Sequence, residues 1–424
     1  MPQRPPPELM SPAGNWTSLQ AAIHAGADAI YFGVHGFNMR DNSNNFAVAE
    51  LPRIARTCRQ AGVRAYLALN TIIYEPELAR MRRVLAAASA AAIDAVICWD
   101  MAVIEAATAL GLPVFLSTQM SVSNSAALAG FHRAFGIRRF VLARECSLAQ
   151  LRSLRRNLVT QLGAAAAANI QLEVFAHCAM CVSISGRCFL SEASTGKSAN
   201  RGQCTQPCRR PYQINSSEGD VSFRMGESYL LSPKDLCTLP FIEQLLECGV
   251  DSLKIEGRGR APEYVSSVTS AYRRAVDFYF ANRRKPGFDA EFEGLKAGLM
   301  QQLEGVYHRG LSSGYYMGKP IDQWSGVPNS QAATKKVHVG EVVKFYRKAG
   351  AVEIRVFDSG FALGDELLIQ GPSTGVLRVA VTSIQIEQQP VPDAKRGQSV
   401  AVALVSPARP GDRVYRVSRR AVAP

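Results

Sequence analysis

Five of the ten cysteines in this 424-residue chain lie within residues 178–208. The stretch "HCAMCVSISGRCFL" occupies residues 177–190, and "GQCTQPCRR" occupies residues 202–210. Thiolates gathered in this way are the ligands of iron–sulfur clusters and of structural zinc. The small residues of "SISG" would also let backbone N–H groups approach cluster sulfides. This segment therefore indicates a metal centre.

Spacing alone leaves three interpretations of the cysteines open. A four-thiolate iron–sulfur cluster would take its ligands from Cys181, Cys188, Cys204 and Cys208. A zinc ribbon would use the C-x2-C pair that ends at Cys181 and the C-x3-C pair that ends at Cys208. Thiols buried as small hydrophobes are the third interpretation. It suits Cys58, Cys98 and Cys248, which sit in helix or strand patterns.

Polar candidates accompany the cysteines. In "SLKIEGR" the charged residues Lys254, Glu256 and Arg258 alternate, so all three point to one side of a strand. Burying such charges in a core costs free energy unless each has a partner of opposite charge or a bound ligand. These residues therefore either form ion pairs with one another or bind an anionic substrate. Arg258 suits bidentate contact with phosphate or carboxylate. His177 is either an oriented hydrogen-bond donor to substrate or sulfide, or a structural histidine.

The elements that must position these residues alternate between strand and helix. Short apolar runs occupy residues 8–14, 25–33, 63–70, 91–100, 112–119, 135–144, 170–178 and 248–258. Amphipathic segments of helical length separate most of them, which predicts a parallel sheet. Eight such units fit a closed (β/α)-barrel, a TIM-like α/β fold. An open doubly wound sheet is the alternative, although no Gly-x-Gly-x-x-Gly follows the first run.

In such a barrel, the residues at the carboxyl ends of the strands line the active-site face. The residues expected there are Gly33, Asn70, Asp100, Gln119, Arg144, Glu145, His177, Glu256 and Arg258. The cysteine-rich segment begins where the seventh run ends, so it should reach the same mouth. Candidate substrate contacts are Arg40 and Asn45 on the loop after the second run, together with Asn70, Gln119, Arg144, Arg209 and Arg210.

The chain divides into four parts by texture. A Pro-rich extension covers residues 1–7, and the barrel is expected over 8–284 with a Cys-rich insertion at 178–212. The barrel part closes on a long amphipathic helix at 262–284. A connecting segment follows at 285–334, and within it the stretch at 298–318 is less regular. Short β-rich runs broken by Gly, Pro and Asp then predict a small all-β barrel over 335–424.

Charge and hydropathy limit the cellular compartments and the kinds of binding partner that are expected. The net charge is +13 and the pI about 9.4, and the excess is mostly arginine. Solvated helix faces explain such an excess, and so does a polyanion partner such as RNA. We expect no membrane span and no secretory signal, because no apolar run is long enough and "MPQRPPPELM" has no apolar core. A cytoplasmic, reducing compartment follows, where cysteine clusters bind metal more often than they form disulfides.

The motifs "PELMSPAG", "GADAIYFG", "EVFAHCAMCVSISGRCFLS", "GQCTQPCR", "SPKDL" and "SLKIEGR" resemble the collagenase-like unassigned-peptidase family thirty-two. They span residues 8–258, and the β-rich tail resembles that of the tRNA hydroxylation branch. The resemblance implies a 4Fe-4S cluster and hydroxylation without molecular oxygen. In the tRNA branch the product is 5-hydroxyuridine at the wobble position, with prephenate implicated as hydroxyl donor or co-substrate. Other branches act on a ribosomal RNA cytidine or a ubiquinone precursor, and the family name records a peptidase activity.

Carried over residue by residue, the resemblance assigns Cys181, Cys188 and Cys204 as cluster ligands. The tRNA branch has a fourth cysteine that matches Cys208, whereas the ubiquinone branch uses a later one, for which Cys237 is the counterpart. The family usually reads His-Gly-Ala where this chain has "HCA", so Cys178 is an additional thiol. The partners implied are tRNA or another RNA and an electron donor, with no DNA and no membrane.

Two motifs are rejected as decoys. "GLSSG" at 310–314 satisfies Gly-x-Ser-x-Gly, but no apolar strand precedes it, so a nucleophile elbow around Ser312 is not expected. "TGKS" at 195–198 lacks the first glycine of a phosphate loop.

Overall fold

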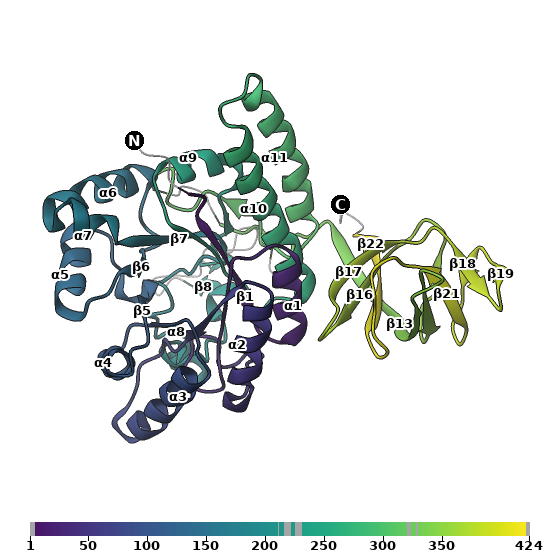
Figure 1. Ribbon diagram of the computed structural model, residues 1–424, viewed down its shortest axis with the longest axis horizontal. Helices are drawn as coiled ribbons and strands as arrows, with labels where there is room; N and C mark the ends of the chain where they lie inside the picture. Colours follow the sequence, from purple (N-terminus) through teal and green to yellow (C-terminus); the bar gives the residue numbers. More distant parts are fainter. Residues whose placement is uncertain are drawn as a thin grey trace.

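The computed structural model describes residues 5–210, 212–215, 222–224, 231–319, 324–327 and 330–420. It consists of a helix-covered barrel and a curled antiparallel sheet beside it (Figure 1). Among these residues, no helix is both long and apolar enough to cross a bilayer.

Eight parallel strands form the closed barrel that the alternating pattern predicts. They are β1 (Glu8–Ala13), β2 (Ala29–Phe32), β3 (Arg64–Ala68), β4 (Ala95–Cys98), β5 (Val114–Leu116), β6 (Arg139–Val141), β7 (Gln171–Cys178) and β11 (Ser252–Ile255). Each pairs in parallel with the next, and β11 pairs with both β1 and β7, which closes the ring. The TIM-like prediction is confirmed, and every one of the eight apolar runs contains its strand.

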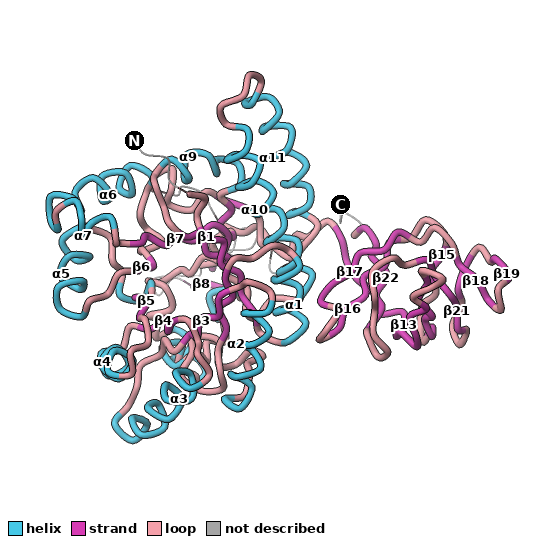
Figure 2. The backbone as a smooth tube through the Cα atoms, in the orientation of Figure 1, coloured by secondary structure: helices cyan, strands magenta, loops and turns pink. Residues whose placement is uncertain are grey.

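Helices cover the outside of this ring, as Figure 2 shows. They include α1 (Trp16–His24), α2 (Leu51–Gln60), α3 (Leu78–Ala90), α4 (Met101–Ala109), α5 (Ser125–Phe135), α6 (Leu148–Leu162), α7 (Ala164–Ala168) and α9 (Ile242–Glu247). In α2, Leu51, Ile54 and Cys58 are buried at helical spacing, while the charged residues between them face outward. Side-chain caps such as Asn15 and Ser147 fix where helices begin.

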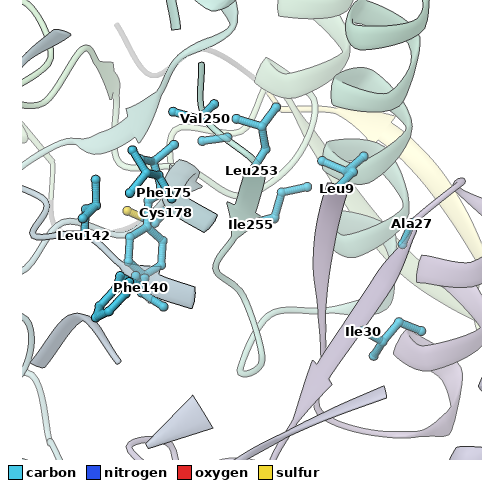
Figure 3. Packing of buried hydrophobic residues seen from close by; sticks show 14 of the residues in the cluster. Leu9, Ala27, Ile30, Phe140, Leu142, Phe175, Cys178, Val250, Leu253 and Ile255 are labelled. Atoms are coloured by element: carbon cyan, nitrogen blue, oxygen red, sulfur yellow. The ribbon is translucent and has the colours of Figure 1, made fainter. Parts of the chain in front are cut away.

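Two apolar layers hold the barrel. The larger lies between strands and helices and includes Leu9, Ile30 and Leu253 (Figure 3). A smaller cluster fills the inside of the ring and includes Tyr66 and Phe115. Because successive strand side chains alternate between these layers, both faces of most strands are largely apolar, which explains the continuous apolar runs in the sequence.

The segment after β7 adds elements that the sequence pattern did not indicate. It contains α8 (Leu190–Thr195), the hairpin β8 (Gln213–Asn215) with β9 (Ser222–Arg224), and β10 (Asp235–Cys237). Strand β10 runs antiparallel to β7 and also pairs with β12 (Leu311–Ser312). This edge brings residues near 309 back to the barrel mouth.

After β11, α10 (Pro262–Asn282) matches the predicted long helix. The expectation of a less regular stretch at 298–318 is wrong over residues 298–304, which form the end of α11 (Phe288–Glu304). Gly294 and Gly298 lower the helical propensity of this segment and obscure its pattern. Packing decides the outcome, because Phe292 stacks on Phe278 of α10 with ring centroids 5.8 Å apart.

The C-terminal unit is an eight-stranded antiparallel sheet in the order β17-β16-β22-β13-β14-β21-β18-β19. Its strands are β13 (Thr334–Tyr346), β14 (Ala351–Val356), β16 (Glu366–Gly371), β17 (Gly375–Ala380), β18 (Ile384–Ile386), β19 (Gln389–Pro390), β21 (Ser399–Ala403) and β22 (Arg413–Arg419), with a small ladder between β15 (Phe361–Ala362) and β20 (Asp393–Ala394). Lys336 of β13 bridges to Glu263 of α10 at 2.9 Å. Gly375 has φ +70°, and a Cβ there would lie 2.9 Å from the Ala21 nitrogen of α1, so a side chain would not fit.

Candidate functional site

A cavity of about 290 Å³ opens at the carboxyl ends of the barrel strands. Its inner wall is formed by strand residues such as Tyr31, Phe175 and Lys254. The sequence candidates that line it are Arg40, Asn70, Gln119, Arg144, Arg209, Lys254, Glu256, Arg258, Cys181, Cys204 and Cys208. The predicted mouth and the cysteine-rich segment therefore meet at one site.

His177 does not line this cavity. It packs on Tyr264 and Tyr272 of α10, with ring centroids 5.9 Å away in both cases. The register of β7 and β11 shifts between Lys254 and Ile255, so that His177 pairs with Ile255 and faces the helix layer. Burial lowers the pKa of His177 to about 3, and its imidazole is therefore neutral at pH 7. This position fits the structural alternative and not a donor to substrate.

Three other candidates for substrate or metal binding also lie outside the lining, as do Gly33, Asp100 and Glu145 of the predicted mouth. Asn45 donates to the carbonyl oxygens of Arg40 and Ser43 at 2.9 Å each, so it shapes the loop that carries Arg40. Arg210 is exposed, and Cys188 is half-buried behind the lining residues. Asn70 lines the cavity and accepts from the Met39 nitrogen at 3.1 Å.

A buried ion network supports the base of the cavity. Glu173, which has no exposed surface, accepts from Arg139 Nε at 2.8 Å and from Lys254 Nζ at 2.9 Å. Arg139 also bonds to Glu8 at the other end of the barrel interior. Burial alone would raise the pKa of Glu173, but Lys254 and Arg139 hold it below its usual range. Glu173 thereby opposes the lowering of the Lys254 pKa by burial.

The alternating charges of β11 do not pair with one another. Lys254 pairs with Glu173, and Glu256 accepts from Arg40 at 2.9 and 3.2 Å. Burial opposes ionisation of Glu256, but nearby cations, of which Arg40 has the largest effect, lower the pKa of Glu256 to about 2. Arg258 forms no ion pair among the described residues and donates only to Asn38 Oδ1, at 3.0 Å.

Arg258 is thus a cation available to an anion. It is 5% exposed, and burial lowers its pKa to about 10, so it still carries its charge at pH 7. A buried guanidinium without a counter-ion is costly, and an anionic ligand would offset that cost. The anion-binding interpretation of "SLKIEGR" rests on this residue.

The four predicted ligand cysteines gather at the edge of the cavity. All four are half-buried, whereas the other six are buried. Burial raises the pKa of Cys208, and the neighbouring thiols of Cys181, Cys204 and Cys188 raise it further. Backbone N–H groups of Leu190 and Gln206 point to the sulfurs of Cys188 and Cys204 at 3.4 Å each. Over the described part of the chain, no three His, Cys, Asp or Glu side chains are arranged to hold a single metal ion.

In number and type, these thiols fit a 4Fe-4S cluster. Such a cluster takes four thiolates, one on each iron, and backbone donors to the sulfurs tune its potential. The other two cysteines considered as ligands lie elsewhere. Cys178 belongs to the buried cluster that includes Phe140 and Phe175 (Figure 3). Cys237 contacts Tyr272 Oη at 3.7 Å and Met300 Sδ at 3.9 Å, next to α10 and α11.

The structure also brings in residues that the sequence pattern missed. Arg260 lies two positions after Arg258 and continues the same alternation, so the pattern could have included it. Arg309 and Gln206 line the cavity as well, but they reach it through β12 and through the turn before Cys208. No local signal in the sequence marks them.

Comparisons with known proteins agree with this geometry. The family described as "Peptidase family U32" matches residues 14–326. "Collagenase" of Porphyromonas gingivalis (strain ATCC BAA-308 / W83) is 39% identical over 415 residues, which cover 97% of this chain and 98% of that protein. "tRNA hydroxylation protein P1" of Bacillus subtilis (strain 168) is 32% identical over 372 residues, 86% of this chain and 84% of that protein.

A third relative and one solved structure extend the comparison. "23S rRNA 5-hydroxycytidine C2501 synthase" of Escherichia coli (strain K12) is 35% identical over 279 residues, 65% of this chain and 40% of that protein. The U32 peptidase Mk0906 is 14% identical, covers 42% of this chain and 73% of its own, and superposes with a TM-score of 0.34. The family match over residues 14–326 and the full-length relatives show that this chain belongs to peptidase family U32.

Proposed function

We propose that this U32 protein is an iron–sulfur enzyme that hydroxylates a base of RNA without molecular oxygen. The target we propose is the tRNA wobble uridine, and the product is 5-hydroxyuridine. One observation carries the proposal: four half-buried cysteines gather beside a cationic cavity at the mouth of a barrel. Relatives named as tRNA and ribosomal RNA hydroxylation proteins support the reaction class.

The cluster would be held by Cys181, Cys188, Cys204 and Cys208. When bound, a 4Fe-4S cluster would supply one-electron chemistry. Replacing C5–H of the base by C5–OH, with a hydroxyl group at the oxidation level of water, releases two electrons and two protons, so a separate electron acceptor would have to take up the electrons. The N–H groups of Leu190 and Gln206 would stabilise charge on the thiolates, because donors to sulfur favour the charged form.

The cavity volume sets what can enter. About 290 Å³ is at the lower end of small-molecule pockets, so the cavity admits small groups such as a single base and excludes folded RNA. The target uridine must therefore leave its stack, which is least costly in a single-stranded anticodon loop. Arg258 and Lys254 would orient a carboxylate-bearing co-substrate, for which the resemblance indicates prephenate.

Peptide hydrolysis is the competing activity, because one relative is named collagenase. Ser312 of "GLSSG" accepts from the Gly314 nitrogen at 3.3 Å and donates to the Asp235 carbonyl at 3.4 Å. A serine nucleophile instead needs a general base within hydrogen-bond reach. The hydrogen bonds of Ser312 described above are to backbone groups, so the geometry does not favour peptide hydrolysis.

Nucleoside mass spectrometry of tRNA from a deletion strain tests the proposal. The expected result is loss of 5-hydroxyuridine and its derivatives, restored by the wild-type gene but not by Cys208→Ser. Cys58→Ala, a thiol in the barrel core, is the matched control and should restore the modification. Unchanged 5-hydroxyuridine in the deletion strain would overturn the tRNA assignment. Lost ribosomal hydroxycytidine instead would move the substrate to ribosomal RNA.

A further inference from the structure

A second cationic group lies beside Cys208, away from Arg258. Arg209, Arg260 and Arg309 all line the cavity, and all three act electrostatically on the buried carboxyl of Asp235. Three cations thus share one carboxylate. The group is assembled from distant parts of the chain, since Arg260 follows β11, Arg309 precedes β12 and Asp235 begins β10.

The Asp235 carboxylate forms no hydrogen bond with the guanidinium groups of Arg260 and Arg309. Arg260 Nη2 lies 3.6 Å from Asp235 Oδ2, and Arg309 Nη1 lies 3.7 Å from Asp235 Oδ1. Both distances exceed those of hydrogen bonds. In the described structure, Asp235 Oδ1 and Arg309 Nε are buried without a hydrogen-bond partner. Asp235 therefore compensates charge while leaving guanidinium N–H groups unused.

The two guanidinium groups are held in place by an aromatic ring. The Arg260 guanidinium lies 3.9 Å from the centroid of the Tyr307 ring, and that of Arg309 lies 5.4 Å from it. Arg309 also donates to Gln206 Oε1 at 3.1 Å. Arg309 is 6% exposed and the Arg260 side chain 16%, so neither can reorient freely in solvent. Such a fixed pair of forks matches the geometry of a phosphate group.

We propose that Arg260 and Arg309, which pack on Tyr307 and share the charge of Asp235, form a binding site for a backbone phosphate of the RNA next to the target nucleotide. This inference rests on the proposed function. Arg209 contributes positive charge to this site but few free hydrogen-bond donors. Its N–H groups already donate to Ser232, to the Pro233 carbonyl and to the Met180 carbonyl. The site lies beside Cys208, so a phosphate bound there would hold the flipped base near the cysteines.

The test measures binding of a fluorescent anticodon stem-loop by anisotropy, without air, over a range of salt. Arg260→Gln and Arg309→Gln should each weaken binding about tenfold, the effect of losing a charged hydrogen bond. The double variant should also reduce the slope of log K against log salt by about 0.7, the value for one single-stranded phosphate, and each single variant should reduce it by part of that amount. Asp235→Asn should tighten binding, because it removes the competing carboxylate. Arg156→Gln, an exposed residue of α6 with the same charge change, is the control and should alter neither quantity.

Opposite directions separate electrostatics from misfolding, since a folding defect would weaken binding in all variants. If the wild type binds the stem-loop and Arg309→Gln binds it equally with an unchanged slope, the phosphate site is refuted while the proposed function stands. If the wild type binds no RNA, the proposed function fails first. Inorganic phosphate is the second probe. Arg309-dependent competition by free phosphate, combined with Arg309-independent RNA binding, would assign the site to a free anion and overturn the RNA assignment.

Discussion

The buried network beneath the cavity makes a quantitative prediction about Glu173. Glu173→Gln keeps the shape of the side chain and removes the charge that Arg139 and Lys254 share. Arg139 retains Glu8 as a counter-ion, whereas Lys254 loses its recorded one. Breaking a buried ion pair costs about 3–5 kcal/mol, because the remaining charge is left uncompensated. We expect a loss near the lower end, about 3 kcal/mol at pH 7, since Lys254 can release its proton instead.

The pH dependence follows from Lys254. In the wild type, burial lowers the pKa of Lys254 more than Glu173 raises it, and removal of Glu173 must lower this pKa further. The folded variant then binds fewer protons than the unfolded chain, so its stability rises with pH toward the unfolded lysine pKa of about 10.4. The deficit relative to the wild type should therefore shrink between pH 7 and pH 10.

Urea unfolding followed by tryptophan fluorescence measures this loss. The three tryptophans are Trp16, Trp99 and Trp324, so the signal reports on the part of the chain before β13. Asp277→Asn removes the exposed partner of an i,i+4 ion pair with Arg273 in α10 and should cost under about 1 kcal/mol. A loss for Glu173→Gln no larger than that of Asp277→Asn, or a deficit that grows with pH, would refute the reasoning.

The remaining predictions concern the site. Protein purified without air should carry about four irons per chain. Cys208→Ser should remove most of them while Cys237→Ser keeps them, as measured by iron and sulfide analysis; one zinc and no iron would instead favour the ribbon. Arg258→Gln should weaken prephenate binding about tenfold or more in calorimetry, and Arg258→Lys should restore part of it; equal affinities would remove Arg258 from the ligand site. Ser312→Ala should leave any hydrolysis of denatured collagen unchanged, and stoichiometric labelling of Ser312 by a serine-directed inhibitor would restore the peptidase interpretation.

Local patterns in the sequence were sufficient to predict the barrel, the β-rich C-terminal unit and the position of the cysteine-rich segment at the barrel mouth. Alternation of apolar runs with amphipathic segments is a local property, and it persists in the fold because each strand buries both faces. The carboxyl ends of parallel strands meet at one mouth, so positions such as Asn70 and Arg144 could be assigned to it in advance. The cysteine-rich segment reached the same mouth because it follows β7 directly.

Only the tertiary structure determined which charged side chains form ion pairs with one another. Lys254 pairs with Glu173 and Glu256 with Arg40, contacts between residues far apart in the chain that only barrel closure creates. A register shift between β7 and β11 turned His177 toward α10, and strand alternation cannot reveal such a bulge. Arg309 enters the cavity because β12 pairs with β10. Local periodicity tells which face of an element is buried, but which charges meet across a closed barrel depends on the packing of the whole chain.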